Sequence, residues 1–254
     1  MPTYKDRGIL RLFDNHLVEL VLTATPIILI AYLVRGICGF GSGLIAIPVL
    51  TLLLPLKVAV PLVVILDYLA SAGQGMSLRQ SIQWSEIRRL IIPALIGVGA
   101  GLMIFHNVDA ELLARLLGGF VFLYAIYALW GPAMPKVSSW WAIPAAISGG
   151  TIGTLFGTGG PFYVTYLKAR QLDANAFRAT FACMFLLDGA ARLTGYLGTS
   201  VIDLELLTLL ALSIPVMIVG MYLGGKIHTT MSAQTFTRGI SILLLASGLS
   251  LMMG

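Results

Sequence analysis

Charged side chains are scarce in this chain. Only 11% of its 254 residues are Asp, Glu, Lys or Arg, whereas 58% are hydrophobic. A soluble globular domain carries roughly 25% charged residues, so this chain has too little charge to cover itself with a water-compatible surface. The deficit excludes a soluble domain and indicates that lipid is the solvent for most of the protein.

Cysteine is also rare. Cys38 and Cys183 are the only two cysteines, and both lie in apolar segments without metal-ligand spacing. The sequence therefore requires no disulfide and predicts neither a metal nor a cofactor. No small-residue cleavage site follows the first apolar stretch, so no removable signal peptide is expected. The net charge of +5 lies mostly in loops, where it indicates membrane topology rather than nucleic-acid binding.

Long apolar runs are abundant. A helix needs about 20 mostly apolar residues to cross roughly 30 Å of hydrocarbon. Such segments lie at approximately 17–35, 58–78, 87–105, 111–130, 140–167, 177–198, 204–225 and 236–253. They predict an all-α integral membrane protein of about seven or eight transmembrane helices. Only short loops remain, so residues 1–254 are expected to form a single membrane domain.

The two halves of the chain resemble each other. The matching segments are 39–43 with 155–159, 66–67 with 187–188, 92–101 with 214–224, and 110–115 with 233–238. The offset grows steadily from 116 (Gly41 to Gly157) to 123 (Arg115 to Arg238). This shared order predicts an internal duplication, with repeat one at about 17–130 and repeat two at about 139–253.

Loop charge predicts how the repeats are oriented. The loops 79–89 and 168–178 each carry three basic residues, and basic loops prefer the cytoplasm. Three full crossings between them would put them on opposite sides. If 140–167 instead enters the membrane, breaks at its glycines and turns back, both loops are cytoplasmic. We expect this re-entrant form and therefore inverted repeats, although eight plain spans with parallel repeats remain the alternative.

The two Gly-rich breaks are the most informative motifs. Residues 39–43 (GFGSG) and 157–161 (GTGGP) each precede an apolar run, so each is expected to begin a short helix inside the membrane. A helix start presents free N–H groups and the positive end of the helix dipole, and glycines let an anion approach that backbone. The other interpretation is that the glycines serve only packing or a kink. The predicted substrate-binding residues are Gly39, Gly41, Ser42, Gly43, Gly157, Thr158, Gly159 and Gly160, together with Arg35 and Arg192.

Charges inside apolar spans mark the second group of candidates. Asp67 and Asp188 lie near the middles of 58–78 and 177–198, and an ionisable group at such depth is expensive and usually functional. Both are predicted to take part in coupling, with structural ion pairs as the alternative. Arg192 is four residues after Asp188 and shares its helix face, whereas Asp67 has no cation within one turn. Asp67 is therefore the better candidate for a proton carrier, and the Asp188–Arg192 pair the better candidate for structure or gating.

Two other function classes can use a bundle of membrane helices. An intramembrane protease needs a nucleophile with a base nearby, but neither His106 nor His228 falls in a helix that could meet Ser42 at depth, so an enzyme is not expected. A passive anion channel remains open, because a channel needs no protonatable residue at its site.

The Gly-rich motifs carry a family resemblance. Residues 39–43 followed by 46–50 (AIPVL), and 156–161 (FGTGGP), resemble the twin signatures of the sulfite exporter TauE/SafE family. The resemblance covers almost the whole chain and implies a multi-pass permease of the bacterial inner membrane for sulfite, organosulfonates or related anions. Small residues and Gly are more usual at the positions of Phe40 and Ser42, so the substrate stays open, with a carboxylate or another small anion as the alternative. The partners expected are the anion, the lipid bilayer and protons as a coupling ion. A homodimer is compatible with the sequence.

Overall fold

The computed structural model describes residues 15–77, 79–130, 136–197, 204–226 and 233–253, and their regular structure is helical, as predicted. The long helices are α2 (Asn15–Cys38), α4 (Leu56–Ser77), α5 (Trp84–Asn107), α6 (Ala110–Trp130), α9 (Ala174–Leu197), α10 (Leu204–Lys226) and α11 (Ala233–Met253). The shorter elements are α3 (Ser42–Leu50), α7 (Ala142–Phe156), α8 (Gly160–Ala169) and the 3-10 turns η1 (Arg79–Ser81) and η2 (Ser139–Trp141).

Five helices in the described ranges are long and apolar enough to cross a membrane. They contain Leu20–Cys38, Leu56–Gly73, Trp84–Asn107, Ala110–Trp130 and Leu206–Lys226. The segment expected at 177–198 forms α9, whose charges Arg178, Asp188 and Arg192 lower its hydropathy. The segment expected at 140–167 is divided into α7 and α8, and the last one lies in α11.

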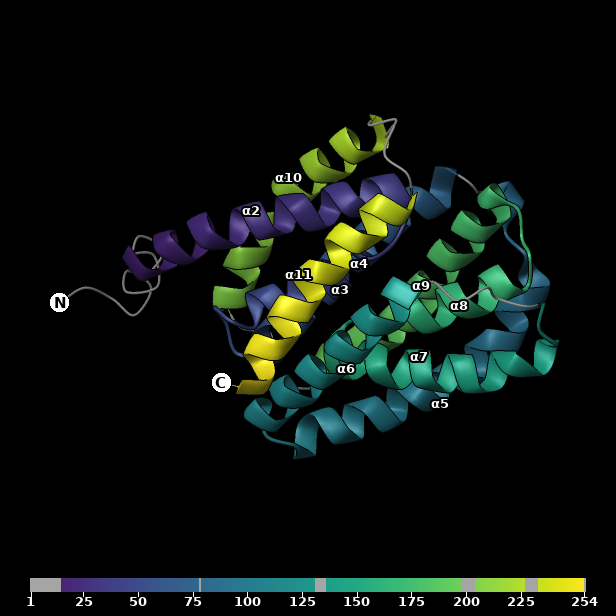
Figure 1. Cartoon of the computed structure of the whole chain (residues 1–254), viewed down its shortest axis with the longest axis horizontal. Helices are drawn as coiled ribbons and strands as arrows, with labels where there is room; N and C mark the ends of the chain where they lie inside the picture. The colour runs from purple at the N-terminus through teal and green to yellow at the C-terminus, as the bar shows by residue number, and fades with distance from the viewer. Residues whose placement is uncertain (1–14, 78, 131–135, 198–203, 227–232, 254) are drawn as a thin grey trace.

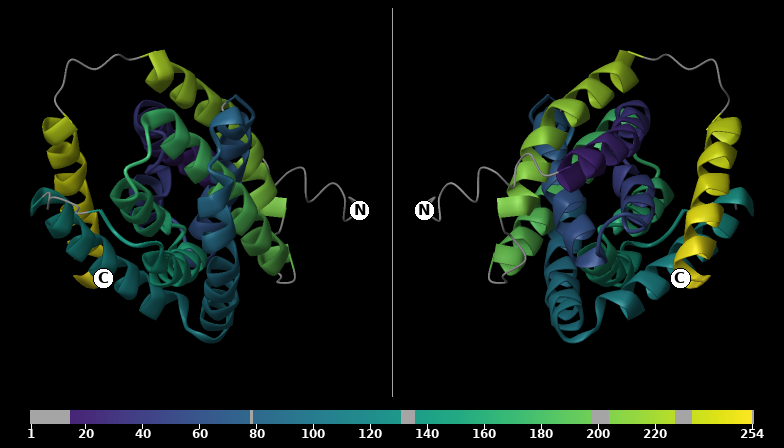
Figure 2. Two further views of the ribbon diagram at one scale, coloured as in Figure 1. Left: turned by 90° about the vertical axis from the view of Figure 1, so that its right-hand side faces the viewer. Right: turned by 90° about the vertical axis from the view of Figure 1, so that its left-hand side faces the viewer.

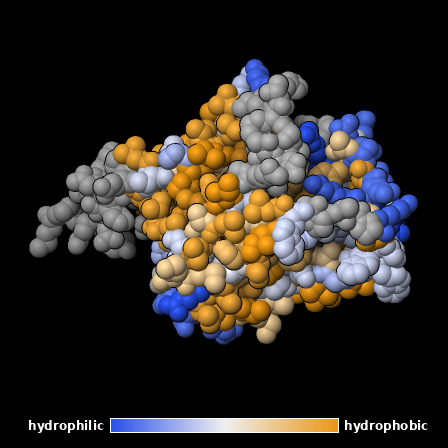
Figure 3. Space-filling view, in the orientation of Figure 1, coloured by the Kyte–Doolittle hydropathy of each residue, from blue (hydrophilic) through white to orange (hydrophobic). Residues whose placement is uncertain are grey.

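The outer surface is unusually apolar. Large hydrophobic side chains point outward from several helices, among them Leu22, Ile92, Leu123, Ile218 and Ile242, each more than half exposed. Figure 3 shows hydrophobic residues over the middle of the visible face and hydrophilic residues gathered at the right-hand end. In water such a surface would drive aggregation, whereas in a bilayer it faces the acyl chains.

Glycines bring pairs of helices into close contact. A Cβ at Gly97 would overlap the carbonyl oxygen of Ile147, so α5 packs directly on the backbone of α7. A Cβ at Gly224 would overlap the carbonyl oxygen of Leu33, so α10 packs in the same way on α2. Gly97 and Gly101 in α5, and Gly220 and Gly224 in α10, are spaced four residues apart, so each pair lies on one helix face and serves this packing. A third close pair, α6 and α11, lies side by side on one flank (Figure 2).

Each Gly-rich segment ends one helix and begins a short one. Gly41 (φ 99°) and Gly157 (φ 61°) have left-handed backbone conformations that a side chain would strain. At the second break the chain turns back: α7 and α8 form a hairpin whose two outer ends are joined by a hydrogen bond from Val137 N–H to the Ala169 carbonyl oxygen, 3.2 Å. The segment 140–167 therefore begins and ends at the same end of the molecule.

The two basic loops meet at that end. Arg170 Nε lies 3.1 Å from Glu86 Oε1, and Arg89 Nη1 lies 3.0 Å from the same oxygen. The backbone N–H of Gln83 donates to Thr180 Oγ1 at 2.9 Å. This is the right-hand end in Figure 1, where Figure 3 shows hydrophilic residues. The loops 79–89 and 168–178 thus share one side, as expected from their charges; that this side is the cytoplasm stays a prediction.

We expect cysteines placed at Gln80 and Gln171 to be labelled from the cytoplasmic side, because both residues are exposed at the basic end. A cysteine at Asn107, at the other end of α5, should be labelled from outside. The measurement is labelling by an impermeant thiol reagent in intact cells and inverted vesicles, in a background without Cys38 and Cys183. Labelling of Gln80→Cys and Gln171→Cys from opposite sides would contradict this topology.

Candidate functional site

The two helix breaks touch each other in the interior. A Cβ at Gly43 would lie 2.6 Å from the carbonyl oxygen of Gly157. The first turns of α3 and α8 therefore start beside the same point. Neither helix has a side-chain cap. The N–H groups in the first turn of α3 are therefore available to a ligand. In α8 Pro161 has no N–H, and the Phe162 N–H donates to the Gly159 carbonyl oxygen at 3.3 Å, so the Gly160 N–H is the one left for a ligand there.

A small cavity lies between the breaks. It leaves room for about one water molecule. Seven of the site residues proposed from the sequence line it: Arg35, Gly41, Gly43, Asp67, Gly157, Thr158 and Gly160. The Thr158 hydroxyl, on a residue only 2% exposed, has no hydrogen-bond partner within the described part of the chain. A buried donor without a partner is costly, and an anion in the cavity would satisfy it.

Asp67 is held by donors from two other helices. Its Oδ1 accepts hydrogen bonds from Ser42 Oγ at 2.6 Å and from Tyr32 Oη at 2.7 Å, and it lies 2.9 Å from Arg35 Nη1. Arg35 also donates to Ser71 Oγ at 2.7 Å. These side-chain bonds all go to Oδ1, whereas Oδ2 lies 3.4 Å from the position of a Cβ at Gly43, beside the cavity. Oδ1 thus carries the contacts that hold Asp67 in place, whereas Oδ2 is left beside the cavity, where it could contact a ligand.

The ion pair with Arg35 contradicts the difference that the sequence suggests between the two aspartates. In the sequence, Asp188 has Arg192 within about one helical turn, whereas Asp67 has no cation that close. Arg35, 32 residues earlier on α2, supplies that cation. Both aspartates are therefore ion-paired, and only the orientation of Asp67 Oδ2 toward the cavity now distinguishes them.

The second ion pair lies behind the cavity wall. Arg192 Nη2 and Asp188 Oδ2 form an ion pair, and Tyr163 Oη donates to the same oxygen at 2.8 Å. Asp188 is fully buried and Arg192 is 1% exposed. The guanidinium lies over the ring of Phe185, 5.6 Å from its centroid, and Phe185 separates it from the cavity. A Cβ at Gly153 would overlap Arg192, so this glycine makes room for the pair.

Several predicted binding residues do not line the cavity. Ser42 is completely buried and acts through Arg35 and Asp67. Gly39 lies against the side chain of Arg178, and a Cβ at Gly159 would overlap the carbonyl oxygen of Gly149. Gly159 thus serves the contact between α8 and α7. Arg192 and Asp188 also stand outside the cavity lining.

Sequence reasoning missed the aromatic part of the site and one buried acid. Phe40, Phe181 and Phe185 complete the cavity lining with Leu44 and Pro161. Phe181 and Phe185 share one face of α9 through their four-residue spacing. Phe40 lies in the first break, and nothing in the local sequence brings it to them. Glu86 joins the two basic loops through Arg170. The sequence did contain a signal for this role, because Glu86 is the acidic residue of an otherwise basic loop.

Comparison with known proteins identifies the family. The sulfite exporter TauE/SafE family matches residues 24–251, nearly the whole chain. The chain belongs to the sulfite exporter TauE/SafE family. The resemblance seen in the Gly-rich motifs is thereby confirmed, and the protein is a membrane transporter of that family.

The chain is also similar to a curated protein, the "Probable inner membrane transporter protein TsaS" of Comamonas testosteroni. It is 25% identical over 197 residues, which cover 75% of this chain and 81% of the relative. No solved structure matches the chain.

Proposed function

We propose that this TauE/SafE protein is a permease that moves small sulfur-containing anions, such as sulfite or an organosulfonate, across the bacterial inner membrane. The observation that carries the proposal is the buried hydroxyl of Thr158 at the start of α8, which lies on the wall of the cavity and has no hydrogen-bond partner among the described residues. Hydroxyl donors and the N–H groups of a helix start are the groups that bind oxyanions. Membership of the family supports the substrate class, and the relative's name supports a location in the inner membrane.

We infer that the two halves are inverted repeats with re-entrant hairpins. In support, α2 and α7 run in opposite directions in Figure 1. The packing partners are also exchanged, since α5 of the first half packs on α7 of the second and α10 of the second packs on α2 of the first. Two halves related in this way can rock about a central site and expose it to each side in turn.

Charge supports proton coupling through Asp67. An anion about 4 Å from an ionised carboxylate is repelled by about 4 kcal/mol at an effective dielectric constant of 20. A proton on Asp67 Oδ2, the oxygen that faces Gly43, would remove this repulsion and leave the three donors on Oδ1 in place. The proton would also offset the work of moving an anion inward, about 2.3 kcal/mol per 100 mV. Asp188 and Arg192 are assigned to structure or gating.

A passive channel and a carboxylate permease remain the competing functions. Both would use the same cavity, so the substrate screen must separate them. A channel would conduct without proton coupling, and a carboxylate permease would bind carboxylates more tightly than sulfur oxyanions. A homodimer stays a prediction.

The test is a binding and uptake screen with the purified, reconstituted protein. It would include sulfite, sulfate, small sulfonates, sulfonated aromatics and carboxylates, each with and without a proton gradient. We expect Thr158→Val to weaken binding of the preferred sulfur anion roughly tenfold to a hundredfold, because a hydrogen bond to a charged group contributes about 1.5–3 kcal/mol.

Thr165→Val is the matched control, since Thr165 is on the same helix but lines a groove outside the cavity. It should leave the affinity unchanged. Failure of every sulfur anion to bind would refute the proposed substrate class. Equal affinity in Thr158→Val and wild type would place the anion elsewhere.

A further inference from the structure

Two cations at the basic end stand beside the first helix break. Lys168 Nζ lies 5.8 Å from the centre of the Phe40 ring. Arg178 lies along Gly39, with its Cγ 3.5 Å from the Cβ position there, and its Nη2 donates to the Ile37 carbonyl oxygen at 3.4 Å. Both side chains are exposed, and neither forms an ion pair with a carboxylate in the described part of the chain. The positive charge of these two side chains is therefore not neutralised by a carboxylate among the described residues. Lys168 and Arg178, beside residues 37–41, are called the mouth below.

A thin aromatic layer separates this mouth from the cavity. Phe40 packs against Phe181 and Phe177, with ring centres 5.8 Å and 6.2 Å away. Phe40 and Phe181 also line the cavity. Phe40 is only half-buried, and its ring both lines the cavity and lies near the exposed Lys168. One aromatic side chain thus lies between the anion site and the basic face.

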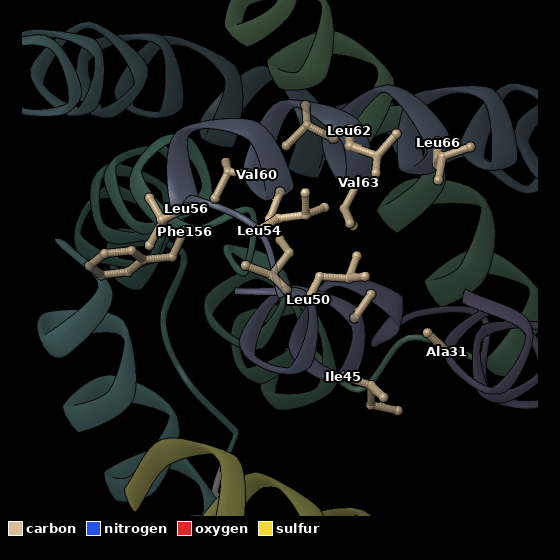
Figure 4. Packing of buried hydrophobic residues seen from close by; sticks show 14 of the residues in the cluster. Ala31, Ile45, Leu50, Leu54, Leu56, Val60, Leu62, Val63, Leu66 and Phe156 are labelled. Carbon is tan, nitrogen blue, oxygen red and sulfur yellow. The ribbon is translucent and has the colours of Figure 1, made fainter. Parts of the chain in front are cut away.

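The second break is packed much more deeply than the first. Phe156 immediately precedes Gly157 and is only 3% exposed. It belongs to the large apolar core with Leu56 and Val60, which are 2% and 0% exposed. Figure 4 shows Phe156 beside Leu56 in this cluster. Leu56 begins α4, whose other end leads to the basic loops, so this dense packing faces away from them.

We propose that Phe40 is the gate between the anion cavity and the basic face, and that Lys168 and Arg178 form an outer binding site that collects small oxyanions at this gate. The inference rests on the proposed function, to which it adds the path by which the anion reaches the cavity. Rotation of one half-buried ring would open the cavity to the basic face, whereas opening at Phe156 requires the core around α4 to separate. The conformation described is therefore one step from opening on the basic side.

Thiol accessibility tests the gate without any transport measurement. The reporter is Thr158→Cys in a background without Cys38 and Cys183, labelled with 2-sulfonatoethyl methanethiosulfonate. We expect Phe40→Ala to raise the labelling rate about tenfold or more from the basic face and to leave the rate from the other face unchanged. Phe122→Ala is the matched control, because Phe122 is also half-buried but packs against Gly248 of α11. It should leave both rates unchanged.

The charges of the mouth are tested in the same assay. In the Phe40→Ala reporter, Lys168→Gln with Arg178→Gln should slow the anionic reagent about threefold to tenfold, because local positive charge concentrates anions. The cationic 2-(trimethylammonio)ethyl reagent should not be slowed. Arg88→Gln, an exposed arginine on the same face, should have little effect on either reagent.

Equal labelling rates with and without the Phe40→Ala substitution would overturn the gate, and equal loss for both reagents would overturn the outer site. If Thr158→Cys does not fold, Leu44→Cys serves as the reporter, since Leu44 lines the same cavity. These results are independent of the substrate screen. Failure of all sulfur anions to bind would refute the proposed function while the labelling rates still report on the route.

Discussion

Replacing Arg192 with methionine is expected to destabilise the protein by about 3–5 kcal/mol, because it leaves a buried carboxylate without its cation. Asp188 is fully buried, and the hydrogen bond from Tyr163 would be the remaining side-chain contact of its Oδ2 in the described residues. The guanidinium also packs between Gly153 and the ring of Phe185. Methionine keeps part of this apolar contact, so the loss measured would be mainly electrostatic.

The measurement is the apparent melting temperature of the detergent-purified protein. Asp188→Leu combined with Arg192→Met should recover most of the lost stability, since a buried ion pair replaced by apolar residues is often nearly neutral. Arg115→Met is the control, because the Arg115–Glu111 pair is exposed and such pairs contribute little. A single Arg192→Met variant as stable as wild type would show that the pair has no structural role and would move it to the transport cycle.

Replacing Asp67 with asparagine is expected to abolish the pH dependence of anion uptake. In the wild type, coupling one proton to one anion lets the anion affinity change by up to about tenfold per pH unit, increasing as the pH falls. Asparagine keeps an oxygen in the Oδ1 position for Arg35, Ser42 and Tyr32, and its amide stands for a protonated Oδ2. The variant should therefore still exchange substrate for substrate, at a rate that no longer varies with pH.

The measurement is uptake and counterflow in proteoliposomes as a function of pH. Asp188→Asn is the matched control, since it removes the other buried carboxylate but faces Arg192 and Tyr163 rather than the cavity. It should lower yield or total activity and keep the wild-type pH profile. An unchanged profile in Asp67→Asn would exclude Asp67 as the proton carrier.

Features that depend on composition and local spacing could be predicted from the sequence. A chain with 11% charge cannot have a water-facing surface of the usual kind. Glycine at positions 41 and 157 was predicted to break the helices, and both have positive φ. The Asp188–Arg192 pair follows from four-residue spacing on one helix, and it forms. In each case the cause lies within a few residues of the effect.

The tertiary structure decided what depends on contacts between distant segments. Arg35 is 32 residues from Asp67, and Glu86 is 84 residues from Arg170, so no helical period relates them. The same holds for Phe40 and Phe181, which meet because the first break packs on α9. Gly159 has the sequence of a binding residue, yet its missing side chain admits the backbone of α7. A glycine looks the same in a sequence whether it makes room for an anion or for a helix, and only the neighbour that fills the space distinguishes the two.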